Sequence, residues 1–226
     1  PKKPAKPAKV PVHRAPPPQQ VRIIGGEWKR TPLPVLDALG LRPTPDRVRE
    51  TVFNWINHLR GGDWNEAVVL DLFAGTGALG FEAASRGARS VLMLDSHTPV
   101  VRQLEVIKDK LKADAVTIMR GDAFVTAQGM AARGQRFDLI FLDPPYGQDF
   151  LAKALPLCEG LLNEGGLVYA EAGEALPYSP EEGAAPAWLA PRQCSRRRCS
   201  RPDRKSVGEG KSVLQSVDLG GRRIIK

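Results

Sequence analysis

Cysteine is scarce in this sequence, and long apolar runs are missing. Only three cysteines occur among its 226 residues, too few for a fold built on disulfides. No apolar run approaches the roughly 18 residues that a membrane-spanning helix needs, and no apolar segment of the signal-peptide type lies near the N-terminus. These absences argue against a secreted or membrane-spanning protein. We therefore expect a cytoplasmic protein without a membrane partner.

Acidic residues are rare at both ends of the chain, and this changes the meaning of the net charge of +8. Residues 1–20 hold five cations and no acid, and residues 192–226 hold eleven cations and three acids. The remaining 17 cations and 22 acids give the body a net charge of −5. Within that body, residues 21–60 hold seven cations against four acids. A polyanion is therefore expected to bind from the N-terminal side.

The first twenty residues contain seven prolines as well as their five cations. Such a composition cannot build a core and predicts a disordered, basic, Pro-rich arm over residues 1–20. The arm either binds nucleic acid or only keeps the chain soluble, and the sequence leaves both possibilities open.

Residues 21–60 form the next predicted unit, a small hairpin followed by a helix. The hairpin is expected to turn at Gly25-Gly26. Thr44 is expected to cap the helix, and Pro45 to occupy its first position. A helical stripe of apolar side chains is expected to face the core: Val48, Val52, Trp55, Ile56 and Leu59.

Strand and helix patterns alternate from residue 67 onward, within a predicted catalytic domain over residues 61–190. Short apolar strands are expected at 67–73, 90–95, 116–122, 137–143 and 167–172, with helices near 78–86, 98–112, 122–132 and 149–162. This alternation predicts a doubly wound, mostly parallel α/β sheet of the Rossmann-like type. Ligands of such sheets bind at the carboxyl ends of the strands.

A glycine motif, G-x-G-x-x-G, runs from Gly75 to Gly80 between a predicted strand and a predicted helix. Asp95, twenty residues after Gly75, is placed to accept hydrogen bonds from ribose hydroxyls. The motif alone fits NAD as well as S-adenosylmethionine. Asp71 favours the methyl donor, because an anion there would repel a pyrophosphate and attract an ammonium group. Asp122 is placed to accept from an adenine amino group, although each of these carboxylates could instead cap a helix.

The segment "FDLIFLDPPYG" ends a predicted strand with Asp143, Pro144, Pro145 and Tyr146. The Asp143 carboxylate and the Pro144 carbonyl could hold the two hydrogens of an exocyclic amine on a nucleobase and aim its lone pair at a methyl group. The prolines remove competing N–H donors, and Tyr146 could stack on a base taken out of its helix. A strand stopped by prolines is the structural alternative.

These motifs, in this order, resemble the bacterial 16S ribosomal RNA guanine-N2 methyltransferase family, which modifies guanine 966. The resemblance runs from about Val21 to Leu176 and rests on "RIIGGEW", "GLRPTPDRVRETVFNW", "DLFAGTGALGFEAASRGA" and "DPPY". It implies a class I methyltransferase fold, S-adenosylmethionine as donor, and action on a small-subunit particle or its precursor. We also expect a monomer without a metal site.

The resemblance assigns roles to particular residues of this chain. Target-amine binding falls to Asp143 through Tyr146. Arg22, Arg30, Arg42 and Arg47 become candidates for rRNA contacts, with surface solvation as the competing explanation for each. Donor binding is implied for Asp71, Phe73, Gly75, Gly77, Asp95, Asp122 and Ala123.

The chain departs from the family pattern in two places. His97 stands where the family often has an acidic residue. Such proteins usually finish the sheet with two further strands, whereas this chain shows no clear apolar alternation after Tyr178. We expect residues 191–226 to be a non-native, disordered tail that resembles translated adapter sequence, and the last strands to be missing or altered.

Three other functions share part of these features. An adenine-N6 methyltransferase acting on DNA or RNA would use the same D-P-P-Y segment. A nicotinamide-dependent dehydrogenase would explain the glycine motif but not that segment. A ribosome-assembly factor could bind the donor without catalysis.

Overall fold

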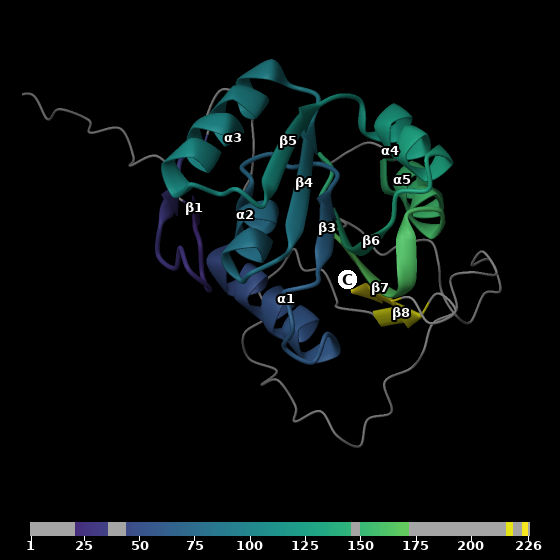
Figure 1. Ribbon diagram of the computed structural model, residues 1–226, viewed down its shortest axis with the longest axis horizontal. Coiled ribbons are helices and arrows are strands. Elements are labelled where there is room, and N and C mark those ends of the chain that lie inside the picture. The colour runs from purple at the N-terminus through teal and green to yellow at the C-terminus, as the bar shows by residue number, and fades with distance from the viewer. Residues whose placement is uncertain (1–20, 36–43, 146–149, 172–215, 219–222, 226) are drawn as a thin grey trace, which may run out of the picture.

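A seven-stranded sheet forms the centre of the protein, seen here as a computed structural model (Figure 1). The structure describes residues 21–35, 44–145, 150–171, 216–218 and 223–225. The strands lie in the order β5-β4-β3-β6-β7-β9-β8. They are β3 Val68–Asp71, β4 Ser90–Asp95, β5 Val116–Arg120, β6 Phe137–Leu142, β7 Leu162–Ala170, β8 Ser216–Asp218 and β9 Arg223–Ile225.

Helices cover both faces of this sheet (Figure 1). One face carries α1 (Asp46–Leu59), α2 (Ala78–Ser85) and α3 (Thr98–Leu111), and the other carries α4 (Ala123–Ala132) and α5 (Phe150–Glu159). Successive residues of a strand point to opposite faces, so Val69 packs into the first core and Leu70 into the second. Strands β3 to β7 are all parallel. The predicted doubly wound α/β fold is confirmed.

The predicted hairpin is present as β1 (Val21–Arg22) and β2 (Pro32–Leu33), but its turn is longer than predicted. Gly25 and Gly26 dock the hairpin onto α2 instead of forming a two-residue turn. The buried carboxylate of Glu82 accepts hydrogen bonds from the N–H groups of Ile24 at 2.6 Å and Gly25 at 2.8 Å. A Cβ atom on Gly26 would lie 1.8 Å from the backbone oxygen of Ser85, so the two segments approach too closely for any side chain there.

Helix α1 begins one residue later than predicted. Pro45 is its N-cap, with an extended backbone (ψ 144°), and helical dihedrals start at Asp46. The predicted cap by Thr44 is wrong, because its hydroxyl contacts the carboxylates of Asp143 and Glu171. Among the described residues, no side chain caps this helix.

The buried stripe of α1 is rotated from the predicted one. Val52 and Ile56 are buried as expected, but Val48 and Trp55 are 37% and 41% exposed, so the prediction that they face the core is wrong. Phe53 is buried instead, with its ring 5.7 Å from that of Phe141 between centroids. A helical stripe three or four residues wide fits more than one rotation, and the contact with the sheet decides between them.

The C-terminal edge bears on the expectation that the last strands would be missing or altered. Two short strands, β8 and β9, lie beyond β7, which itself begins earlier than predicted. Strand β9 runs parallel to β7, and β8 runs antiparallel to β9. Residues 1–20 and 172–215 lie outside the described residues. The predicted disorder of these segments and the non-native origin of the tail therefore remain predictions. In the part of the chain that the structure describes, no helix is long and apolar enough to span a membrane.

Candidate functional site

Four aspartates meet at one edge of the sheet, as the parallel strands predict. Asp71 and Asp95 are the last residues of β3 and β4, Asp143 directly follows β6, and Asp122 lies two residues after β5. The carboxyl ends of parallel strands face the same side, where ligands of such sheets bind.

The glycine motif forms a tight turn between β3 and α2. Gly75 and Gly77 have positive φ angles of 49° and 77°, a region that side chains disfavour. Asp95 braces this turn, because its Oδ2 accepts a hydrogen bond from the Gly75 N–H at 3.1 Å. Its Oδ1 accepts from the backbone N–H of His97 at 2.8 Å. The carboxylate is thus held in place from both sides, and its side chain is still 11% exposed.

Asp71 is a buried carboxylate with one oxygen left over. The residue is 1% exposed, and its Oδ2 accepts a hydrogen bond from the Gly80 N–H in α2 at 3.0 Å. Its Oδ1 is buried and has no hydrogen-bond partner among the described residues. Burial, with a smaller contribution from the charge of Asp95, raises the pKa of Asp71 to about 7. An unsatisfied buried carboxylate oxygen is costly unless a donor or a cation meets it.

Asp122 caps α4, so the structural alternative considered for this residue is what the geometry shows. Its Oδ1 accepts hydrogen bonds from the N–H groups of Phe124 and Val125, both at 2.9 Å. The neighbouring Ala123 is 9% exposed. The cap uses one oxygen, and the carboxylate is exposed at the sheet edge.

Three phenylalanine rings gather beside these strand ends. Phe73, from the turn after β3, lies 6.3 Å from Phe124 and 5.9 Å from Phe150 between ring centroids. Phe124 and Phe150 stack at 5.7 Å. Each ring is only partly buried, so the cluster offers an apolar surface at the edge where the carboxylates lie.

The D-P-P segment follows β6, at the centre of this edge. Asp143 is partly buried, and its Oδ2 lies 3.3 Å from the Thr44 hydroxyl. Burial, followed by the negative charges of Glu171 and Asp71, raises the pKa of Asp143 well above its usual range. Pro144 is buried and Pro145 is exposed. Tyr146 lies outside the described residues, so its predicted stacking role stays a prediction.

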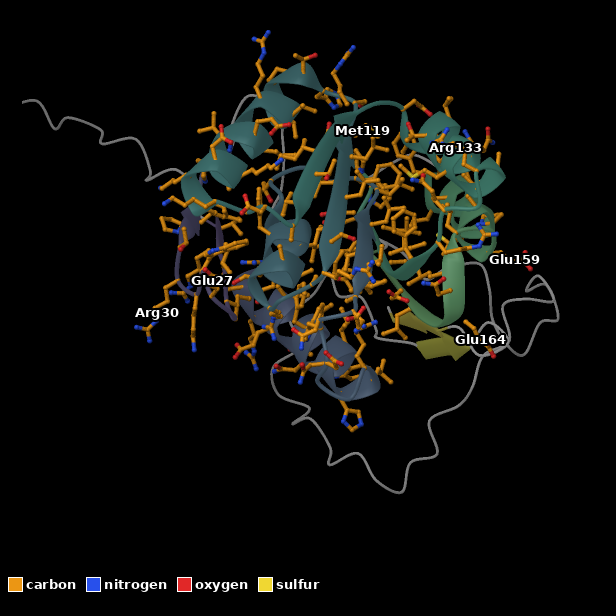
Figure 2. The ribbon with its side chains drawn as sticks, in the orientation of Figure 1. Glu27, Arg30, Met119, Arg133, Glu159 and Glu164 are labelled. Atoms are coloured by element: carbon orange, nitrogen blue, oxygen red, sulfur yellow. The ribbon has the colours of Figure 1, made fainter. Side chains whose placement is uncertain are left out.

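All four predicted RNA-binding arginines belong to residues 21–60, which we call the N-terminal extension, and the structure describes three of them. Arg22 is exposed and pairs with Asp46 at 2.6 Å. Arg47 is exposed on α1. Arg30 extends outward from the hairpin (Figure 2), where its φ of 70° is unusual for a residue with a side chain. Arg42 lies outside the described residues.

Sequence reasoning missed three residues of this neighbourhood. Thr44 and Glu171 lie beside Asp143, and Arg49 contacts the backbone oxygen of Thr44. Arg49 is fully buried, and its guanidinium donates to the backbone oxygens of Thr44 at 3.3 Å and Arg22 at 2.8 Å. A signal was available, because Arg49 sits in the helical register of the buried residues Phe53 and Ile56. Glu171 directly follows β7, just as Asp143 directly follows β6. Its place at the end of a strand was therefore a signal that it belongs to the site.

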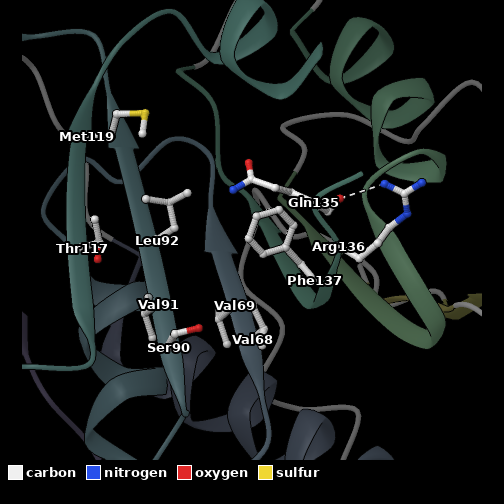
Figure 3. A pocket seen from close by; sticks show the side chains of 10 residues that line it. All are labelled: Val68, Val69, Ser90, Val91, Leu92, Thr117, Met119, Gln135, Arg136 and Phe137. Atoms are coloured by element: carbon white, nitrogen blue, oxygen red, sulfur yellow. Dashed lines mark hydrogen bonds between the residues drawn. The ribbon is translucent and has the colours of Figure 1, made fainter. Parts of the chain in front are cut away.

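An open groove lies elsewhere on the sheet and holds none of the predicted site residues. It is lined by the beginnings of β3, β4 and β6 and by Thr117 and Met119 of β5 (Figure 3). Arg136 is the one charged side chain in its lining, and it bonds to the backbone oxygen of Gln135 at 2.9 Å. Among the described residues, no group of three or more His, Cys, Asp or Glu could hold a metal ion.

Comparisons with known proteins agree with this arrangement. A sequence family described as "Conserved hypothetical protein 95" matches residues 21–184. The ribosomal RNA small subunit methyltransferase D of Escherichia coli (strain K12) is 40% identical over 154 residues, covering 67% of this chain and 74% of that protein. The protein of the same name from Haemophilus influenzae is 38% identical over 170 residues, covering 72% of this chain and 84% of the relative.

A solved structure shows the same fold. A hypothetical protein of Thermus thermophilus superposes with a TM-score of 0.59 at 30% identity, covering 66% of this chain and 83% of that one. The sequence matches span most of the described residues, from the docked hairpin through β7. This chain therefore belongs to the family of the ribosomal RNA small subunit methyltransferase D proteins.

Proposed function

We propose that this protein transfers a methyl group from S-adenosylmethionine to the exocyclic N2 amine of a guanine in small-subunit 16S rRNA. The pairing of β3 with β6 carries this proposal. Asp71 lies opposite Phe141 in the register of these two strands, so Asp143 follows two residues further along the same edge. A donor bound beside the glycine turn and an amine bound at the D-P-P segment would therefore be neighbours.

The residues around the glycine turn fit the proposed donor. The unpartnered Oδ1 of Asp71 is suited to the ammonium group of the donor's amino acid end. Asp95 is held at the sheet edge by Gly75 and His97, and part of its side chain is exposed. In this proposal the exposed part accepts from ribose hydroxyls. A dehydrogenase cofactor would instead bring its pyrophosphate toward the buried anion at Asp71. When bound, S-adenosylmethionine supplies an electrophilic methyl group on a sulfonium sulfur.

Asp143 and Pro144 act on the target amine in this proposal. The lone pair of a guanine N2 amine is delocalised into the ring, so the amine is a poor nucleophile. The Asp143 oxygen that does not face Thr44 and the Pro144 carbonyl would accept its two N–H hydrogens. Holding the nitrogen this way aims its lone pair and costs little reorganisation during the reaction.

Small-subunit rRNA is proposed as the substrate because the similar proteins from Escherichia coli and Haemophilus influenzae are named for that activity. Arg22 and Arg30 of the hairpin and Arg47 of α1 are exposed, and in this proposal they contact phosphates of the rRNA. The choice of guanine N2 rests on the family resemblance.

The test is methylation of small-subunit particles from cells that lack this modification, with labelled S-adenosylmethionine and nucleoside analysis of the product. We expect N2-methylguanosine at a single site. N6-methyladenosine as the sole product would instead support the adenine alternative. If no label is transferred, the same assay on a chain carrying a relative's C-terminal strands distinguishes a damaged enzyme from a wrong assignment.

A further inference from the structure

The hydroxyl of Thr44 lies between two carboxylates at the sheet edge. Its Oγ1 is 3.3 Å from Oδ2 of Asp143 and 3.0 Å from Oε2 of Glu171. Thr44 is 7% exposed, and it precedes α1, far in sequence from both acids. The phenol of Tyr169 also donates to Oε2 of Glu171, at 3.2 Å. Glu171 in turn is anchored through its backbone N–H, which donates to the Leu142 oxygen at 2.8 Å.

Counting protons shows why this contact is unusual. A hydroxyl has one hydrogen, so Thr44 can donate to one carboxylate at a time. Both contacts are hydrogen bonds only when the other acid is protonated and donates to the hydroxyl oxygen. With both acids ionised, two anions would face the same hydroxyl in a partly buried place. The geometry therefore favours one shared proton in the group formed by Thr44, Asp143 and Glu171.

The surroundings of Asp143 also favour a bound proton. Burial, followed by the negative charges of Glu171 after β7 and Asp71 on β3, raises the pKa of Asp143, while the hydrogen bond from Thr44 lowers it. Tyr169 contributes a neutral phenol from β7. The protonation of Asp143 thus depends on two neighbours, Glu171 and Thr44, that push it in opposite directions.

Thr44 is held in this place by the N-terminal extension. The fully buried Arg49 donates from Nε to the Thr44 backbone oxygen at 3.3 Å, and from its Nη2 to the Arg22 oxygen at 2.8 Å and to Asp46 at 2.6 Å. A residue that only capped α1 would turn its hydroxyl toward the first helical turn. Thr44 turns its hydroxyl toward Asp143 instead, and leaves the helix uncapped.

We propose that Thr44 and Glu171 are positioning residues for the target amine. They hold the shared proton on the Glu171 side of the Thr44 hydroxyl, which leaves the Asp143 carboxylate ionised to accept from the amine. This inference rests on the proposed role of Asp143 in methyl transfer. It adds two residues from outside the D-P-P segment to the amine site, one of them from the N-terminal extension.

The test compares Thr44→Val, Thr44→Ser and Glu171→Gln in the full chain, with small-subunit particles as substrate. Thr44→Val keeps the shape but removes the hydroxyl, so the acid limb of the pH–kcat profile should move to higher pH. Glu171→Gln removes a negative charge, so this limb should move to lower pH. Both should lower kcat on the order of tenfold with an unchanged KM for the donor, and Thr44→Ser should restore both measures.

A matched control is Thr51→Val on the exposed face of α1, where the hydroxyl donates to the Arg47 oxygen. It should leave the profile as it is. Acid limbs that coincide in wild type, Thr44→Val and Glu171→Gln would overturn the inference, even if turnover fell, because a purely structural defect does not move them in opposite directions.

A second readout does not require activity. In the protein without donor, the loss of stability with rising pH should be smaller in Glu171→Gln and larger in Thr44→Val than in wild type. Should the wild-type chain prove inactive, this measurement still decides the inference, and parallel stability curves would reject it. Failure of the proposed function and failure of this inference are thus separable.

Discussion

Asp143 and Asp71 are both acids with raised pKa values, yet we assign them to opposite ends of the reaction. Asp143 contacts Thr44 and follows the strand that ends at the proposed amine site. Asp71 contacts the N–H of Gly80 behind the glycine turn. Substitutions at these two residues should therefore affect different measurements.

We expect Asp143→Ala to lower methyl transfer by at least about a hundredfold, because it removes an acceptor that holds the amine in the transition state. Donor affinity, measured by calorimetry, should stay within a few-fold of wild type. Asp114→Ala is the matched control, since Asp114 is an exposed aspartate after α3, and it should change neither quantity. Near-normal turnover in Asp143→Ala would remove this residue from the mechanism.

Asp95→Ala should show the opposite pattern. Loss of the carboxylate removes the proposed ribose contact and the brace on the Gly75 N–H, so donor affinity should fall by about tenfold or more. At saturating donor, turnover should recover much of its wild-type value. An unchanged dissociation constant would contradict the ribose assignment.

The buried carboxyl of Asp71 also makes the stability of the donor-free protein depend on pH. The pKa of Asp71 is about 7 in the folded protein and lower when unfolded, so the folded state binds more protons between about pH 4 and 7. Stability should therefore fall as pH rises through this window. By pH 8 the accumulated loss from this one group is about 4 kcal/mol.

Asp71→Asn removes the ionisation while keeping an acceptor for the Gly80 N–H. The variant should be more stable than wild type at pH 8 and similar at pH 5, as measured by urea unfolding of the donor-free proteins. Asp143 titrates with the same sign in both proteins, and its pKa should fall in the variant because the charge of Asp71 helps to raise it. The difference between the two curves therefore reports Asp71 together with its effect on Asp143. Parallel curves would show that Asp71 is ionised without cost, and the argument for an ammonium partner would lose its support.

At the scale of whole elements, the docking of the hairpin on α2 determines where Arg22 and Arg30 lie. Glu82 accepts from two backbone N–H groups of the hairpin, and Arg86 pairs with the same carboxylate at 2.8 Å. Arg86 also lies over the Phe53 ring, 4.9 Å from its centroid. The hairpin, α2 and α1 are thus fixed to one another around one buried carboxylate.

Gly26→Ala tests this docking. The added Cβ would meet the Ser85 oxygen at 1.8 Å, and φ is +74°, so both a clash and backbone strain are introduced. Gly61→Ala is the matched control, because its φ is +67° and nothing lies within 4 Å of its Cβ. We expect the control to lose about 1 kcal/mol of stability from strain and Gly26→Ala about 2 kcal/mol more. Equal losses in urea unfolding would mean that the hairpin moves without cost.

Much of the element arrangement was predictable, because periodicity and strand ends are local properties of the sequence. The parallel strands, the glycine turn and the edge where the aspartates meet followed from such patterns. The rotation of α1 did not, because Val48 and Phe53 fit a helical stripe equally well until the sheet decides. The place of Thr44 was also missed, since its contacts with Asp143 and Glu171 span 99 and 127 positions of the chain.

At the scale of the whole molecule, the charge distribution predicts how RNA binding responds to salt. Residues 1–20 carry five cations and lead directly into β1 and Arg22. Each phosphate contact on single-stranded RNA contributes about 0.7 to the slope of log affinity against log salt. If the arm binds RNA, removing residues 1–20 should reduce the slope by up to about 3.5.

A full-length chain whose five arm cations are replaced by glutamine is the control, and it should behave like the deletion. The basic C-terminal segment is present in both proteins, so its contribution cancels from the comparison. Slopes equal to that of the unaltered chain would mean that the arm only solubilises the protein, and that Arg22, Arg30 and Arg47 must account for the electrostatic part of binding.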